Sequence, residues 1–306
     1  MSQELSIYSL PAAIQSIPLS QGYNDWRHKL YLNSNEEKSQ ENVRILAKKI
    51  LPSHKDTVIG TSGLHTLNIA AFRGIENSST SGEIKYIIIF DRSRRTEHFW
   101  QEAEKIITFA QDRFQAMEYI TQLVLNNAEF YFSGNKSCDS PAIQAKGAVY
   151  HLEFDYHHGH SCFSQEKTFR RIQDIFRKKN FFFLRIDVQD TAAFSALAKC
   201  INKFQLHVDT LYVSNIAEFV EETKNGLRKF QESMKGLIQN NTYIIDTKER
   251  PEGLLSNKHP LQRIRQITMK EEAKAPVEEI FKGSPKEIES SINKEPQNAL
   301  AMLNFK

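Results

Sequence analysis

The chain has 306 residues, of which 40% are hydrophobic and 25% are charged, so it can fill a core and is not disordered throughout. Its 40 Lys and Arg against 37 Asp and Glu give a net charge of +3, which does not indicate nucleic-acid binding. Three widely spaced cysteines without a CxxC pair exclude a disulfide framework and predict a reducing, cytoplasmic location. Neither a membrane span nor a secretory signal is predicted, because the chain lacks a long apolar run and a positively charged start.

Helix and strand patterns alternate along most of the chain. Residues 1–52 are predicted to form a helical and irregular segment that ends at Pro52 and packs on the core. A β-rich run, 57–59, leads into the turn Gly60-Thr61-Ser62-Gly63 and a helix at 64–72. The run 86–90 is apolar on both faces, which is typical of a buried parallel strand.

The pattern after the second strand starts with a long stretch that has no strand signal. We expect a large insert there, at about residues 92–180, with a less regular part at 129–160. Beyond it, strands and helices alternate again. The expected helices are 95–115, 118–126, 165–178, 191–204 and 216–239, and the expected strands are 181–187, 208–215 and 242–246.

Strands separated by helices of this length pair in parallel. The sequence therefore predicts an α/β fold with a doubly wound, mostly parallel sheet of the Rossmann-like type, formed by residues 53–254. Residues 255–306 are rich in charge and proline and poor in aromatic residues, so we expect a mostly disordered tail. This tail is either a solubilising segment or an export signal that a secretion machinery recognises.

Polar residues follow each predicted strand, at the edge where such sheets bind ligands. The glycine turn supplies backbone freedom and helix N–H groups, and each acid can contact a ligand or cap the next helix. Either Asp187 or Asp190 can contact a ligand, and either can instead cap the helix that begins at residue 191. The candidate cofactor contacts are Gly60, Thr61, Gly63, Asp91, Arg92, Asp187, Ser214 and Asn215. Arg92 belongs to a basic cluster, 92–95, which either starts a solvated helix or faces an acidic ligand.

With the glycine turn, Asp91, Asp187 and Ser214-Asn215 in these positions, residues 40–246 resemble a class I S-adenosylmethionine-dependent methyltransferase. The resemblance implies S-adenosylmethionine as cofactor, with Asp91 on its ribose and Asp187 near adenine. The segment 30–37 is similar to one in a group of uncharacterised bacterial proteins with this core, and implies substrate contacts by Asn35 and Glu36. The turn keeps two of the family's three glycines, and one strand is visible where the family has an antiparallel hairpin.

A histidine-rich segment, residues 155–162, contains His157, His158 and His160. Histidine suits proton transfer near neutral pH, so these three are the catalytic candidates, placed on a loop over the site. A zinc site is the weaker interpretation, because no second group of ligands completes the set, and no metal is predicted.

Two functions remain open from the sequence. The first is a methyltransferase-like protein with a small-molecule or protein acceptor, cytoplasmic or translocated into a host cell as a bacterial effector. The second is a non-catalytic interaction protein that reuses the fold.

Overall fold

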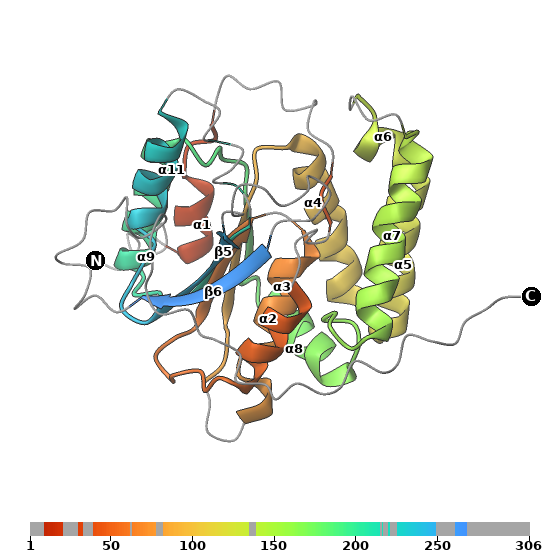
Figure 1. The fold of residues 1–306 in the computed structure, drawn as a ribbon, viewed down its shortest axis with the longest axis horizontal. Coiled ribbons are helices and arrows are strands. Elements are labelled where there is room, and N and C mark those ends of the chain that lie inside the picture. The colour runs from red at the N-terminus through yellow and green to blue at the C-terminus, as the bar shows by residue number, and fades with distance from the viewer. Residues whose placement is uncertain are drawn as a thin grey trace, which may run out of the picture.

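The computed structural model describes residues 9–20, 30–32, 39–61, 63–77, 82–134, 139–214, 216, 220, 225–248 and 261–267. Within them, six strands form one sheet in the order β3-β2-β1-β4-β5-β6 (Figure 1). The strands are β1 (Thr57–Thr61), β2 (Tyr86–Phe90), β3 (Phe181–Leu184), β4 (Val208–Ser214), β5 (Thr242–Lys248) and β6 (Leu261–Ile267). The first five are parallel and β6 is antiparallel to β5, which confirms the predicted doubly wound α/β fold.

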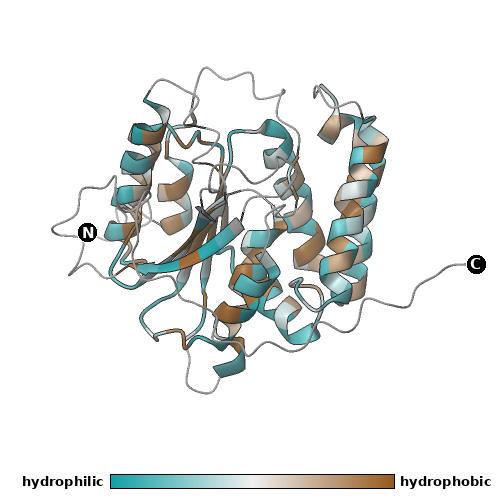
Figure 2. Cartoon of the chain, in the orientation of Figure 1, coloured by the Kyte–Doolittle hydropathy of each residue, from teal (hydrophilic) through white to brown (hydrophobic). Residues whose placement is uncertain are grey.

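Helices cover both faces of the sheet, which explains why the central strands are apolar on both sides (Figure 2). One face packs against α2 (Ser39–Lys48), α3 (Leu64–Phe72), α4 (Arg94–Phe109) and α8 (Glu166–Arg177), and the 3₁₀ helix η3 (Ile75–Asn77) follows α3. The other face packs against α1 (Leu10–Gln15), α9 (Thr191–Lys203) and α11 (Gly226–Lys235). None of the helices described here is long and apolar enough to cross a membrane.

The insert between β2 and β3 is helical. The part predicted to be less regular is instead α6 (Ala128–Phe132) and α7 (Pro141–His157), and α7 packs against α5 (Arg113–Asn126). Helices α4 and α5 are separate because Asp112 caps the start of α5. Its carboxylate accepts a hydrogen bond from the N–H of Gln115 at 2.9 Å. In Figure 1, α5 and α7 form an outer layer beside α4, on the side of the molecule away from α9 and α11.

The strand β6 corrects the predicted tail. Residues 261–267 were assigned to a disordered segment, but they pair along their whole length with β5, from Thr242↔Ile267 to Lys248↔Leu261. The strand is stable there because Asp246 of β5 accepts hydrogen bonds from Arg263 and Arg265, so two arginines can lie at a mostly buried position. The antiparallel partner of the last predicted strand, which was not visible in the sequence pattern, is therefore β6. The rest of 255–306 lies outside the described residues.

Candidate functional site at the strand ends

The turn after β1 needs its glycines for the packing of the protein itself. A Cβ atom on Gly60 would lie 2.4 Å from Oγ1 of Thr66, a hydroxyl that donates a hydrogen bond to the Thr61 carbonyl at 2.9 Å. Gly63 has φ +92°, and a Cβ there would lie 2.6 Å from the carbonyl oxygen of Leu32. Both glycines thus allow close approach, as the sequence suggested, but the described neighbours are protein groups.

The segment 30–32 crosses this turn. The N–H of Leu64, the first residue of α3, donates to the Leu32 carbonyl at 2.6 Å, and the N–H of Leu30 donates to the Tyr131 carbonyl at 3.0 Å. The segment therefore joins the glycine turn to α6. The predicted substrate contacts Asn35 and Glu36 follow it by a few residues and lie outside the described residues.

At the end of β2, Asp91 and Arg92 are close enough for their charges to act on the hydroxyl of Tyr31. Oδ1 of Asp91 accepts a hydrogen bond from the N–H of Ser93 at 2.7 Å, while the Ser93 hydroxyl caps α4. Partial burial raises the pKa of Tyr31 above its usual value, the charge of Asp91 raises it further, and Arg92 lowers it. Because Ser93 makes the cap, Asp91 is not needed for that role and its carboxylate remains a candidate ligand contact.

At the end of β3, Asp187 is almost fully buried and pairs with Arg92. Nη1 of Arg92 lies 3.2 Å from Oδ2 of Asp187, and the N–H of Gln189 donates to Oδ1 at 2.8 Å. Asp190 makes the alternative contact predicted from the sequence, because it caps α9 through the N–H of Ala193 at 3.0 Å. One residue of the basic cluster thus bridges the ends of two neighbouring strands.

Ser20 fixes the turn that follows β3. Its hydroxyl donates to Oδ2 of Asp190 at 2.7 Å and accepts a hydrogen bond from the N–H of Asp187 at 2.9 Å. The carboxylate of Asp187 is therefore held on an ordered turn, three residues beyond the end of β3.

At the other side of the switch in strand order, Ser214 ends β4 and lies opposite Asp246 in the register. The structure places the Ser214 backbone at the predicted edge. Asn215 lies outside the described residues. The sequence did not indicate Asp246 as a site residue, because its two arginine partners lie in the stretch assigned to the tail.

A buried histidine at this edge was also missed. His65 of α3 is 5% exposed, and its ring centroid lies 4.9 Å from that of Tyr212 on β4. Gln262 contacts His65 and accepts a hydrogen bond from Nδ2 of Asn42 at 2.9 Å. Burial lowers the pKa of His65 to about 4, so the ring is neutral at pH 7, and its Nε2 has no hydrogen-bond partner in the described part of the chain.

The structure does not bring the predicted catalytic histidines to this edge. His157 and His158 are exposed at the end of α7, and His158 contacts the Phe154 carbonyl through Nδ1 at 2.7 Å. His160 is buried, and burial lowers its pKa to about 4.

The histidine-rich segment contacts α2, the middle of α3 and the start of α5, where Nη1 of Arg113 donates to the Tyr156 hydroxyl at 2.7 Å. Nε2 of Gln40 donates to Asp155 at 2.7 Å, and the N–H of Cys162 donates to Asn68 at 2.8 Å. These residues therefore do not form the predicted loop over the strand ends. Across the described ranges, no group of three or more His, Cys, Asp or Glu residues could hold a metal ion.

Comparisons with known proteins add a family without an assigned function. The family described as a domain of unknown function (DUF7790) matches residues 142–275, from α7 through β6. No curated protein matches the chain.

Among solved structures, the chain is similar to the rRNA methyltransferase aviRa from Streptomyces viridochromogenes, in two structures at 2.4 Å and 1.5 Å. Each has a TM-score of 0.36 and 10% sequence identity, and the match covers 80% of this chain and 90% of that one. We therefore base the fold on the strand order and the function on the site.

Proposed function

We propose that the chain is a methyltransferase-like protein that binds S-adenosylmethionine at the carboxyl ends of β1, β2 and β3. The observation that carries this proposal is that the glycine turn, Asp91 and Asp187 lie at the ends of three neighbouring strands, beside the reversal of strand order. Open α/β sheets bind nucleotide-like ligands at this place, and a carboxylate after the second strand can accept hydrogen bonds from ribose hydroxyls.

The residues present fit such a cofactor in two respects. Asp91 is only partly buried at the end of its strand, and Tyr31, whose hydroxyl is affected by the charge of Asp91, is 53% exposed, so a carboxylate and an aromatic side chain are available near the same strand end. Arg92 would stay with Asp187 and hold the β3 end in place. When bound, S-adenosylmethionine would supply an electrophilic methyl group, and Ser214 and Asn215 would lie on the acceptor side.

Among the residues that the structure describes, a buried base lies at this edge. His65 is neutral at pH 7, and its Nε2 can accept a proton or a hydrogen bond from a group near the end of β4. Methyl transfer depends mainly on alignment of the two reactants, and a base is needed where the nucleophile carries a proton. His65 therefore replaces His157, His158 and His160 as the proton acceptor in this proposal.

The test is calorimetric titration of the full chain with S-adenosylmethionine and its demethylated product. Asp91→Asn should weaken binding by about 10- to 100-fold, because a hydrogen bond to a charged acceptor contributes about 1.5–3 kcal/mol. Asp174→Asn, an exposed aspartate on α8, is the matched control and should bind like the wild type. Absence of binding of either ligand at millimolar concentration would overturn the proposal.

A second candidate function, an interaction protein without a cofactor, is favoured by the contacts already made at the strand ends. Leu32 accepts the first N–H of α3, and both oxygens of Asp187 bind protein donors. This candidate predicts that Asp91→Asn leaves partner binding unchanged and that neither cofactor form binds.

Export into a host cell through the C-terminal tail is a further part of the proposal, and it depends on the composition of the tail. Because 261–267 belong to the sheet, the reporter fusion that tests export should carry residues 268–306. A reporter that stays in the producing cell, in a strain that exports other cargo, would remove this part alone.

A further inference from the structure

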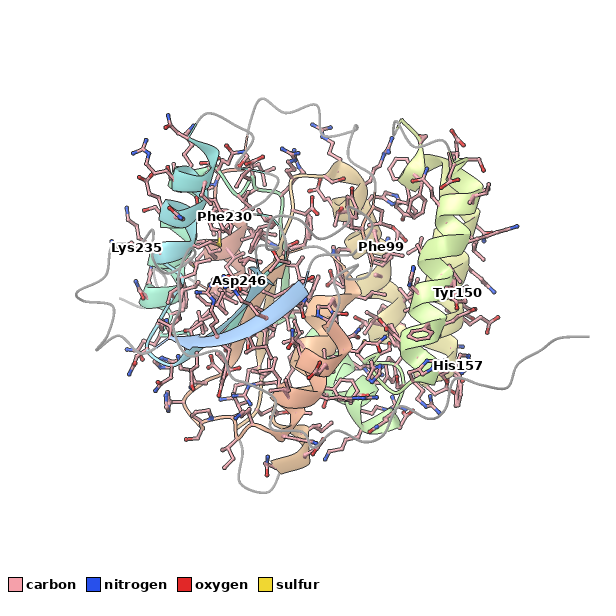
Figure 3. All side chains as sticks on the ribbon, in the orientation of Figure 1. Phe99, Tyr150, His157, Phe230, Lys235 and Asp246 are labelled. Carbon is pink, nitrogen blue, oxygen red and sulfur yellow. The ribbon has the colours of Figure 1, made fainter. Side chains whose placement is uncertain are left out.

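The outer face of α7 carries an apolar stripe. Ile143, Tyr150 and Phe154 are 57%, 63% and 38% exposed, and with Gly147 they recur at intervals of four, three and four residues. This spacing places them on one side of the helix. The opposite side, with Ala145, Val149 and Leu152, is buried in the protein. Figure 3 places Tyr150 and His157 on α7 at the edge of the molecule, away from Phe230 and Asp246.

Gly147 is the second observation. It lies inside a 17-residue helix, where glycine is less favourable than alanine, and a Cβ atom added there would meet nothing within 4 Å. The fold of the single chain therefore does not require glycine at this position. A glycine in an exposed apolar stripe permits another helix to approach closely.

The charges beside the stripe are self-complementary. Lys146 and Glu153 are both exposed and flank the same side of it, seven residues apart. If two copies of α7 packed antiparallel about a two-fold axis near Tyr150, Lys146 of each copy would lie opposite Glu153 of the other. Side chains of a helix lean toward its N-terminus, so Phe154 of one copy would cover Gly147 of the other.

From these features we propose that the outer face of α7 is the contact surface of a homodimer, with two copies of α7 packed antiparallel. The partner that fits this surface is a second copy of the chain. A two-fold axis near Tyr150 places Lys146 opposite Glu153 twice, brings the two Tyr150 rings together and places each Phe154 over the Gly147 of the other copy. A single helix pair is at the small end of protein interfaces, so we expect a reversible dimer with a dissociation constant on the order of 10–100 µM.

The experiment is sedimentation velocity on the full chain over a concentration series. Lys146→Glu and Glu153→Lys should each raise the dissociation constant by about tenfold, because either change places like charges opposite each other twice. The two single variants mixed in equal amounts should form a heterodimer, and the double variant should dimerise like the wild type. Lys199→Glu, a charge reversal on the exposed face of α9, is the matched control.

Gly147→Ala separates folding from association. It should raise the thermal midpoint of unfolding, because alanine favours the helix and fits the single chain, and it should weaken the dimer. A wild-type chain that stays monomeric at several hundred micromolar would overturn the proposal, whether or not another protein binds α7. A dimer that survives all of these variants, or single variants that do not recover on mixing, would overturn it as well.

Discussion

Replacing Arg73 by methionine should cost a large part of the stability of this protein. Arg73 directly follows α3 and is fully buried with Asp209 of β4, where Nε lies 2.7 Å from Oδ2 and Nη2 lies 3.1 Å from Oδ1. The same guanidinium donates to the carbonyls of Leu46, Lys49 and Ile50 at the end of α2. One side chain thus joins two helices to the centre of the sheet.

The magnitude follows from what the substitution leaves behind. Methionine fills much of the volume, but Asp209 keeps a buried charge, and the carbonyls at the end of α2 lose the hydrogen bonds that Arg73 donates. Removing one partner of a buried ion pair costs about 3–5 kcal/mol, against a total of about 5–15 kcal/mol for a typical domain. Arg73→Lys should cost less, because a charge remains although the paired geometry is lost.

Urea unfolding, followed by far-ultraviolet circular dichroism and tryptophan fluorescence, measures these differences. Adding Asp209→Asn to Arg73→Met should recover part of the loss, because it removes the uncompensated charge. A loss below about 1 kcal/mol for Arg73→Met, or strictly additive effects in the double variant, would refute the reasoning that the pair acts as a unit.

Two more predictions concern the strand-end site. Burial lowers the pKa of His65 from 6.5 to about 4, so below pH 6.5 the folded state binds fewer protons than the unfolded state. The free energy of unfolding should therefore fall as the pH drops from 6.5 to 4, by up to roughly 3 kcal/mol. Urea titrations at several pH values should show a flatter profile for His65→Asn than for the wild type. Gly63→Ala should lower the free energy of unfolding by about 1–3 kcal/mol, because φ is +92° and its Cβ would meet the Leu32 carbonyl; thermal melts that match the wild type would show that the segment moves freely.

The central strands could be predicted because burial on both faces leaves a plain pattern. Tyr86–Phe90 and Phe181–Leu184 are short, continuous apolar runs, as a parallel strand covered on both faces requires. The parallel direction of these strands followed from the helices between them, whereas their order in the sheet came from the structure.

Helix α7 and strand β6 could not be predicted from periodicity. The apolar residues of α7 lie on its inner and its outer face, so no single stripe stands out from the sequence. The residues of β6 alternate with charges, and only the carboxylate of Asp246 on the neighbouring strand makes a buried Arg265 acceptable. Both elements depend on neighbours that the sequence alone does not place.

The candidate site divides in the same way. Asp91 and Asp187 could be found because Asp91 directly follows β2 and Asp187 lies three residues beyond β3, and the strand ends of a parallel sheet meet at one edge. The bridge from Arg92 to Asp187 depends on the register of β2 with β3, and the position of His65 depends on Tyr212 across the switch in strand order. The prediction that the histidine-rich segment lies over the strand ends was wrong, because a cluster of residues in the sequence does not determine which part of the fold its loop packs against.

The last strand decides where this chain can be shortened. A truncation at residue 255, which composition alone would favour, removes β6 and turns β5 into the edge of the sheet. Tyr243, Ile244 and Ile245 are buried on both faces of β5, so the new edge would offer unpaired N–H and C=O groups along an apolar strand, a template for pairing with other chains. Asp246 would at the same time keep its buried carboxylate without either arginine. A truncated form that ends at 255 should therefore aggregate on expression, whereas one that ends just after Ile267 keeps β6 paired with β5.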